Sequence, residues 1–327
     1  MHWGTIKIYA FDSIATLIAS SSDYRLPDRA PKSFIKFPPT SPLLHQAVAR
    51  MNYLHSPYMK SGKLLNRDLL YTLHIIMNEP IRLIRLFEWR SLTDMEMAAI
   101  GTFWKYIGDM MEIDFVAELN KDRWDDGINF LEDVTQWASK YEDEHMRRTR
   151  DGQILVGHLL DFFYSSYPVF MRPLIYGLAF VLMGDRWRQI FSLPEPGTAT
   201  VAFTYTFLLA RKLCMRFLAL PRSIATDYIS EPDIKTGRMH HYHYLKEPWY
   251  LPATIWNRWG PLAWLVWATG GMIPGDGGPA MKPEGFLFED LGPKGKMGKG
   301  IEATAHLAEV AQGKLSKGCP FSRSAAS

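Results

Sequence analysis

Apolar residues recur at steps of three and four along most of the chain, which is the spacing of one face of an α-helix. The clearest example begins at Ser41-Pro42, a pattern typical of a helix N-cap followed by proline at the first helical position. Gly62 is placed to end this helix. Its apolar face contains Leu44, Ala47, Val48, Met51, His55 and Tyr58. The pattern therefore predicts a helix that turns this face, His55 included, toward a core.

The same periodicity predicts further helices. Asn66 is expected to cap a helix from Arg67 to about Asn78, with a kink or a restart at Pro80. Thr93-Asp94-Met95-Glu96 has the capping-box pattern and predicts a helix to about Met111. Additional helices are predicted over 125–146, 153–164, 172–191, 198–218 and 301–312. Alternation of the kind that marks strands and hairpins is absent, so the fold class is all-α.

Composition divides the chain into three parts. Residues 1–40 form an N-terminal segment, residues 41–273 a large helical domain, and residues 274–327 a tail rich in Gly, Pro and Lys that wraps the domain or is partly disordered. The hydrophobic fraction of 47% and the charged fraction of 22% are ordinary for a globular protein. The 11 Trp suit either a thick core or walls around a flat apolar ligand.

Charge and cysteine content exclude several classes of protein. The net charge is only +3 without a dense basic stripe, so no nucleic acid partner is expected. The two cysteines, Cys214 and Cys319, make neither a disulfide framework nor a thiolate metal site, which favours a reducing compartment. We expect an intracellular protein, either cytoplasmic or on the cytoplasmic face of the endoplasmic reticulum membrane.

The N-terminus does not read as a signal peptide, and no apolar run reaches the ~18 to 20 residues of a membrane-spanning helix. Two shorter apolar segments, Pro173 to Met183 and Trp259 to Ile273, are either core helices or interfacial membrane patches. We prefer the core interpretation and keep peripheral membrane contact as the alternative.

His55 is the side chain on this apolar helix face that can coordinate a metal or transfer a proton. A histidine that points into a core needs partners for both ring nitrogens, so one interpretation is a structural histidine bonded to polar neighbours. The other is an axial ligand, because a neutral imidazole on a helix can present itself to a flat haem. The residues alone favour the structural interpretation over the ligand interpretation.

Several ordered motifs resemble one known family. They are Ala49-Arg50-Met51-Asn52-Tyr53-Leu54-His55, Glu88-Trp89-Arg90-Ser91-Leu92-Thr93-Asp94, Gly101-Thr102-Phe103-Trp104-Lys105, Gly108-Asp109-Met110-Met111-Glu112-Ile113, Leu220-Pro221-Arg222 and Trp256-Asn257-Arg258-Trp259-Gly260-Pro261. In order and spacing they are similar to the family of bacterial latex-clearing proteins (rubber oxygenases) and the ER-bound oxygenase of mycophenolic acid biosynthesis, and most similar to its fungal branch.

The resemblance implies a single all-helical domain with a globin-like core around one haem b. His55 matches the proximal iron ligand. The implied reaction uses dioxygen to cleave a carbon–carbon double bond of an isoprenoid or other lipophilic substrate. Such an enzyme needs one firm protein ligand to the iron, one open iron position and an apolar channel.

The resemblance also suggests other site residues. Arg29-Ala30-Pro31-Lys32-Ser33 is the counterpart of a distal motif, which makes Arg29 and Lys32 catalytic candidates, although Pro31 argues against an unbroken helix there. Arg50 and Asn52 flank His55 and could bind a haem propionate or support the histidine. As purely structural residues they would be exposed helix positions.

Two other histidine groups are interpreted structurally. His74 is expected to be an interior histidine with satisfied ring nitrogens. His240, His241 and His243 have no carboxylate or cysteine companions at ligand spacing and are expected to form a polar loop. The functional alternative to a haem oxygenase is a catalytically silent helical module that binds a lipid-like ligand or a partner.

Overall fold

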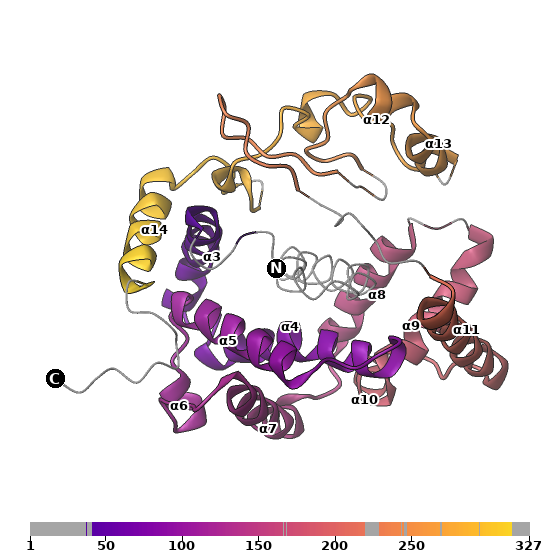
Figure 1. The fold of residues 1–327 in the computed structure, drawn as a ribbon, viewed down its shortest axis with the longest axis horizontal. Helices are drawn as coiled ribbons and strands as arrows, with labels where there is room; N and C mark the ends of the chain where they lie inside the picture. Colours follow the sequence, from indigo (N-terminus) through magenta and orange to yellow (C-terminus); the bar gives the residue numbers. More distant parts are fainter. Residues whose placement is uncertain are drawn as a thin grey trace. The chain divides into compact units, whose positions relative to one another are not determined.

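The computed structural model describes residue 37 and residues 41–165, 167, 169–219, 229–242, 244, 247–268, 270–293 and 295–315 (Figure 1). Helices dominate these residues and no strand occurs among them. The only extended pairings within this part of the chain are two isolated bridges, Ile229 with His241 and Met239 with Phe286. The predicted all-α fold class is therefore confirmed.

The described residues form two compact units. The first contains residues up to 145, residues 218–219 and residues from 288 onward; the second contains residues 146–217 and 229–287. The first unit consists of α3 (Pro42–Lys60), α4 (Asn66–Phe87), α5 (Asp94–Met110), α6 (Phe115–Leu119), α7 (Gly127–His145), η4 (Phe288–Asp290) and α14 (Ile301–Leu315). The helical domain predicted over 41–273 spans parts of both units.

The predicted start of α3 is confirmed. The Ser41 hydroxyl accepts a hydrogen bond from the backbone N–H of Leu43 at 3.3 Å, and Pro42 occupies the first helical position. The helix ends at Lys60, and Gly62 follows with a φ of +67°. The local signals at both ends therefore determined the bounds of the helix that carries His55.

The prediction for α4 was wrong in two respects. Leu65 is the N-cap residue, and its N–H is bonded by the Asp68 carboxylate at 2.9 Å, whereas the Asn66 side chain bonds both the N–H and the carbonyl of Asp114. The helix also runs past Asn78 to Phe87 without a restart at Pro80, which is buried inside it; the alternative of a kink at Pro80 stays a prediction. Tertiary packing of the apolar face of this helix outweighs the loss of one backbone hydrogen bond.

The capping box of α5 is confirmed, because Thr93 Oγ1 accepts from the Glu96 N–H and the Glu96 carboxylate accepts from the Thr93 N–H. Helix α5 then crosses α7 closely at two glycines. A Cβ atom on Gly101 would lie 2.0 Å from the carbonyl oxygen of Gly127. Only glycine permits this approach.

Two apolar clusters hold the first unit together. One lies between α4, α5 and α7 and contains Leu69, Leu70, Leu73, Met77, Ile100, Ile113, Phe115, Trp124, Phe130, Leu131 and Val134. The other lies between α3, α5 and α14 and contains Leu44, Val48, Tyr106, Ile107, Met110 and Ala311. Helix α14, which follows the predicted bounds closely, lies beside α3 (Figure 1). This second cluster places the helix with His55 between α5 and α14.

The second unit contains α8 (Arg150–Ser165), η2 (Val169–Met171), α9 (Arg172–Met183), α10 (Asp185–Ile190), α11 (Thr198–Phe217), α12 (Ile255–Trp259), α13 (Pro261–Ala268) and η3 (Gly278–Met281). The single helix predicted over 172–191 is wrong. Gly184, with a φ of +85°, separates α9 from α10. None of the described helices combines the length and the apolar character needed to cross a bilayer.

The core interpretation of the Trp259 to Ile273 segment is also wrong for its large side chains. Trp259, Trp264 and Trp267 are exposed, and only the small side chains Ala263 and Val266 of α13 are buried. Periodicity could not reveal this, because nearly every position of the segment is apolar.

Candidate functional site

His55 lies in the last third of α3 with its side chain turned inward. The residue is only 6% exposed, as the predicted apolar face requires. Burial lowers the pKa of the imidazole below its ordinary value of 6.5, so the ring is neutral at pH 7. A neutral imidazole has one nitrogen with a free lone pair, which is the form that binds iron.

The Nδ1 atom of His55 is buried and has no hydrogen-bond partner among the described residues. Leaving a buried polar atom unpaired costs about 1–3 kcal/mol. A structural core histidine normally avoids this cost by bonding a carbonyl or a carboxylate. The expectation of a satisfied structural histidine is therefore not met by the groups that surround His55 in the described part of the chain.

The α3 helix is bonded to α5 near this histidine. Asn52 donates a hydrogen bond from Nδ2 to the backbone carbonyl of Met110 at 2.8 Å. About two turns earlier on the same side, His45 Nε2 lies 3.2 Å from the Tyr106 hydroxyl. Together with the apolar contacts of Leu44 and Val48, these bonds hold the α3 face that carries His55 against a rigid neighbour.

Arg50 holds the other side of α3. Its guanidinium donates to four backbone carbonyls of residues 288–293 and 295–300, which we name the C-terminal loop. Nε bonds Leu291 at 3.0 Å, Nη1 bonds Lys299 at 2.6 Å, and Nη2 bonds Glu289 and Lys296, each at 2.8 Å. Arg50 is 2% exposed, so the expectation that a structural Arg50 would be an exposed helix position is wrong. Four carbonyls compensate its buried charge.

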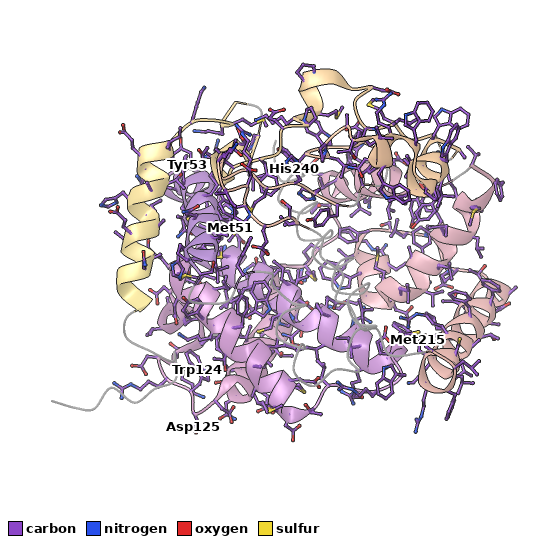
Figure 2. All side chains as sticks on the ribbon, turned by 45° about the horizontal axis from the view of Figure 1, so that its top comes forward. Met51, Tyr53, Trp124, Asp125, Met215 and His240 are labelled. Carbon is purple, nitrogen blue, oxygen red and sulfur yellow. The ribbon has the colours of Figure 1, made fainter. Side chains whose placement is uncertain are left out.

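The C-terminal loop follows the surface of α3 closely. A Cβ atom on Gly300, whose φ is +75°, would lie 2.1 Å from the Tyr53 ring. The Arg50 guanidinium and the Lys296 ammonium both lie over this ring, 5.1 and 5.9 Å from its centroid. Figure 2 labels Tyr53 on α3, on the side of the C-terminal elements. The Lys-Gly run of the tail therefore packs closely against the helix that carries His55.

The remaining predicted site residues are placed as follows. Arg29 and Lys32 lie outside the described residues. His74 on α4 is half-buried; its Nδ1 lies 2.9 Å from Asn78 Nδ2 and its ring stacks on Tyr71, so one of its two ring nitrogens has a partner of the expected kind. In the His-rich run, His240 Nδ1 lies 3.3 Å from the Tyr250 carbonyl, and His243 is outside the described residues. No group of three or more metal-ligating side chains occurs in the described part of the chain.

Sequence reasoning missed the role of Arg50. The carbonyls that it binds belong to residues about 240–250 positions later in the chain. No local spacing signals such a contact. The only available hint was a glycine-rich, weakly patterned tail that nevertheless contains a predicted helix at 301–312.

Comparison with known proteins identifies relatives. The chain is 33% identical over 333 residues to the ER-bound oxygenase mpaB' of Penicillium brevicompactum, covering 96% of this chain and 78% of the relative. It is also 33% identical to the ER-bound oxygenase mpaB of the same fungus, covering 88% of this chain and 70% of that protein. The chain belongs to the mpaB oxygenase family. This confirms the resemblance to the fungal branch that the motifs indicated.

The mpaB similarity extends over nearly the whole chain, so it includes α3, α5 and the C-terminal loop. A third relative, the ER-bound oxygenase mpaB of Penicillium roqueforti, is 33% identical over 196 residues. No protein-family model matches the chain, and no solved structure matches it.

Proposed function

We propose that this member of the mpaB family is an oxygenase that holds one haem b through His55. The observation that carries the proposal is the buried, neutral imidazole whose Nδ1 has no partner among the described residues. Coordination or a cofactor-linked hydrogen bond would satisfy this ring. Bound haem would supply an iron atom with one open position for dioxygen.

In this proposal the described residues hold the iron ligand His55 in a fixed position. Asn52 bonds α3 to α5, and Arg50 bonds α3 to the C-terminal loop, so the His55 backbone is held from two sides. The predicted contact of Arg50 and Asn52 with a haem propionate stays a prediction. Because both side chains already donate to backbone carbonyls, we assign them the support of the ligand helix.

The substrate is proposed to be an isoprenoid or another lipophilic molecule with a carbon–carbon double bond, cleaved with dioxygen. The family relation supports the oxygenase class, and the resemblance to rubber oxygenases suggests the double-bond chemistry. Arg29 and Lys32 remain the proposed distal residues. Because the relatives are named ER-bound, we further propose association with the cytoplasmic face of the endoplasmic reticulum membrane.

The decisive experiment is an absorption spectrum of the purified protein after expression with added haem. We expect a Soret band that His55→Gly lowers by roughly tenfold or more, and that added imidazole restores by replacing the missing ligand. His74→Phe, which removes a histidine from the neighbouring α4 helix, is the matched control and should keep the band.

Two outcomes would refute the haem assignment. A wild-type protein that folds but stays colourless would favour a catalytically silent helical module that binds a lipid-like ligand or a partner. Equal loss of the Soret band in His55→Gly and His74→Phe, with no rescue by imidazole, would show that His55 has no special role.

A further inference from the structure

The short helices α12 and α13 present a continuous set of large apolar side chains to solvent. We call this set the tryptophan surface. It consists of Ile255, Trp256, Trp259, Leu262, Trp264, Leu265 and Trp267, which are between 46% and 84% exposed. Isolated exposed apolar residues are normal, but a contiguous group of this kind marks a contact surface.

The packing of α13 is inverted relative to an ordinary surface helix. Its small residues Ala263 and Val266 are turned toward the protein and are only 3% and 6% exposed. Its two tryptophans, Trp264 and Trp267, point outward. A helix that buries its small side chains and exposes its largest ones gains little from the protein and is suited to an apolar partner.

The polar groups of this region are turned away from the tryptophan surface. Arg258 is the only charged residue of residues 255–268. Its guanidinium bonds the Pro274 carbonyl and, at 3.0 Å, the Asp276 carboxylate. The Asn257 amide donates to the Pro252 carbonyl at 2.9 Å. The outward face therefore offers no uncompensated charge to an acidic or a basic protein partner.

The four indoles retain their hydrogen-bonding capacity. None of the N–H groups of Trp256, Trp259, Trp264 and Trp267 donates to another described residue. The rings also lie together, with centroids 6.0 Å apart for Trp259 and Trp264, and 5.7 Å apart for Trp264 and Trp267. A side chain with an apolar body and a free polar N–H is best placed where hydrocarbon meets headgroups and water.

We propose that the tryptophan surface inserts shallowly into the interface of a lipid bilayer. The inference rests on the proposed association with the endoplasmic reticulum membrane and names the side chains that make it. Since α12 and α13 have only 5 and 8 residues, they lie in the headgroup region without crossing the bilayer. Because the surface carries no free charge, neutral lipids are sufficient and the contact does not depend on anionic headgroups.

The test is flotation of the full-length, haem-supplied protein with phosphatidylcholine vesicles. We expect the protein to float, at low and high salt alike, because apolar insertion is not screened by ions. The double variant Trp264→Ser with Trp267→Ser should lower the bound fraction by roughly tenfold or more. Brominated lipids should quench the fluorescence of the wild-type protein and quench the variant much less.

The matched control is Phe203→Ser with Phe207→Ser, which removes an exposed, stacked aromatic pair from α11 in the same unit. It should float like the wild type. The proposal is overturned if wild-type protein stays at the bottom of the gradient, if the tryptophan variant floats undiminished, or if the variant instead abolishes a dimer of the wild type. The Soret band, recorded on every sample, reports separately on the haem proposal.

Discussion

Arg50 and Lys299, which are 249 residues apart in the sequence, are joined by a hydrogen bond of 2.6 Å from Nη1 to the backbone carbonyl. Three further bonds from the same guanidinium bind Glu289, Leu291 and Lys296. The helix that carries His55 is therefore stabilised by a loop that lies about 240–250 residues later in the chain.

Substitution of Arg50 should destabilise the first unit strongly. Arg50→Ala leaves four backbone carbonyls without their donor, and each unpaired buried group costs about 1–3 kcal/mol, partly recovered by water and relaxation. We expect a loss of about 3 kcal/mol or more in the free energy of unfolding, measured by urea denaturation. Arg85→Ala, at the exposed end of α4, is the control and should change stability by less than about 0.5 kcal/mol. Similar values for the two variants would contradict the role assigned to Arg50.

The close crossing of α5 and α7 should not tolerate a methyl group. Gly101→Ala places a Cβ atom against the Gly127 carbonyl oxygen, and relief requires the two helices to separate. We expect a destabilisation of about 3 kcal/mol in thermal or urea unfolding. Gly157→Ala is the matched control within α8, because nothing lies within 4 Å of its added Cβ. It should stabilise by about 0.5–1 kcal/mol. A neutral Gly101→Ala would show that the crossing is loose.

His74 should make stability depend on pH below neutrality. Burial lowers the pKa of His74 from 6.5 to about 4, so the native protein binds fewer protons than the unfolded chain between these values. The contribution of neutral His74 to the free energy of unfolding is complete above pH 6.5 and declines as the pH falls toward 4. It amounts to about 3 kcal/mol. His74→Phe removes it. Urea denaturation at several pH values should therefore give a shallower acid-side slope for the variant, and parallel curves would refute the assignment.

The helices could be predicted where the signal was local. Ser41-Pro42 and the Thr93 capping box marked their helix starts correctly, because a cap is a bond between near neighbours. Asn66 misled because its side-chain amide does not form a local cap: it donates to the backbone carbonyl of Asp114, 48 residues away. A residue type that favours caps does not reveal a distant competing partner.

The candidate site was predictable in part. Helical spacing placed His55 on the buried face of α3, and the structure confirms that burial. Helical spacing gave no indication that Arg50 donates hydrogen bonds to the C-terminal loop, because a charged residue on a helix usually faces water. The outward direction of Trp264 and Trp267 was equally hidden, since an apolar run has no polar side from which to orient it.

The bonds of Arg50 also determine when the His55 helix can be completed during synthesis. At about 5–20 residues per second, the ribosome finishes the C-terminal loop roughly ten to fifty seconds after Arg50 has been made. Until then the guanidinium has none of its native acceptors, and the nascent α3 lacks one of its two supporting sides. Binding of the proposed haem at His55 is therefore expected after release of the finished polypeptide, and a message truncated before residue 288 should yield a chain that cannot assemble this site.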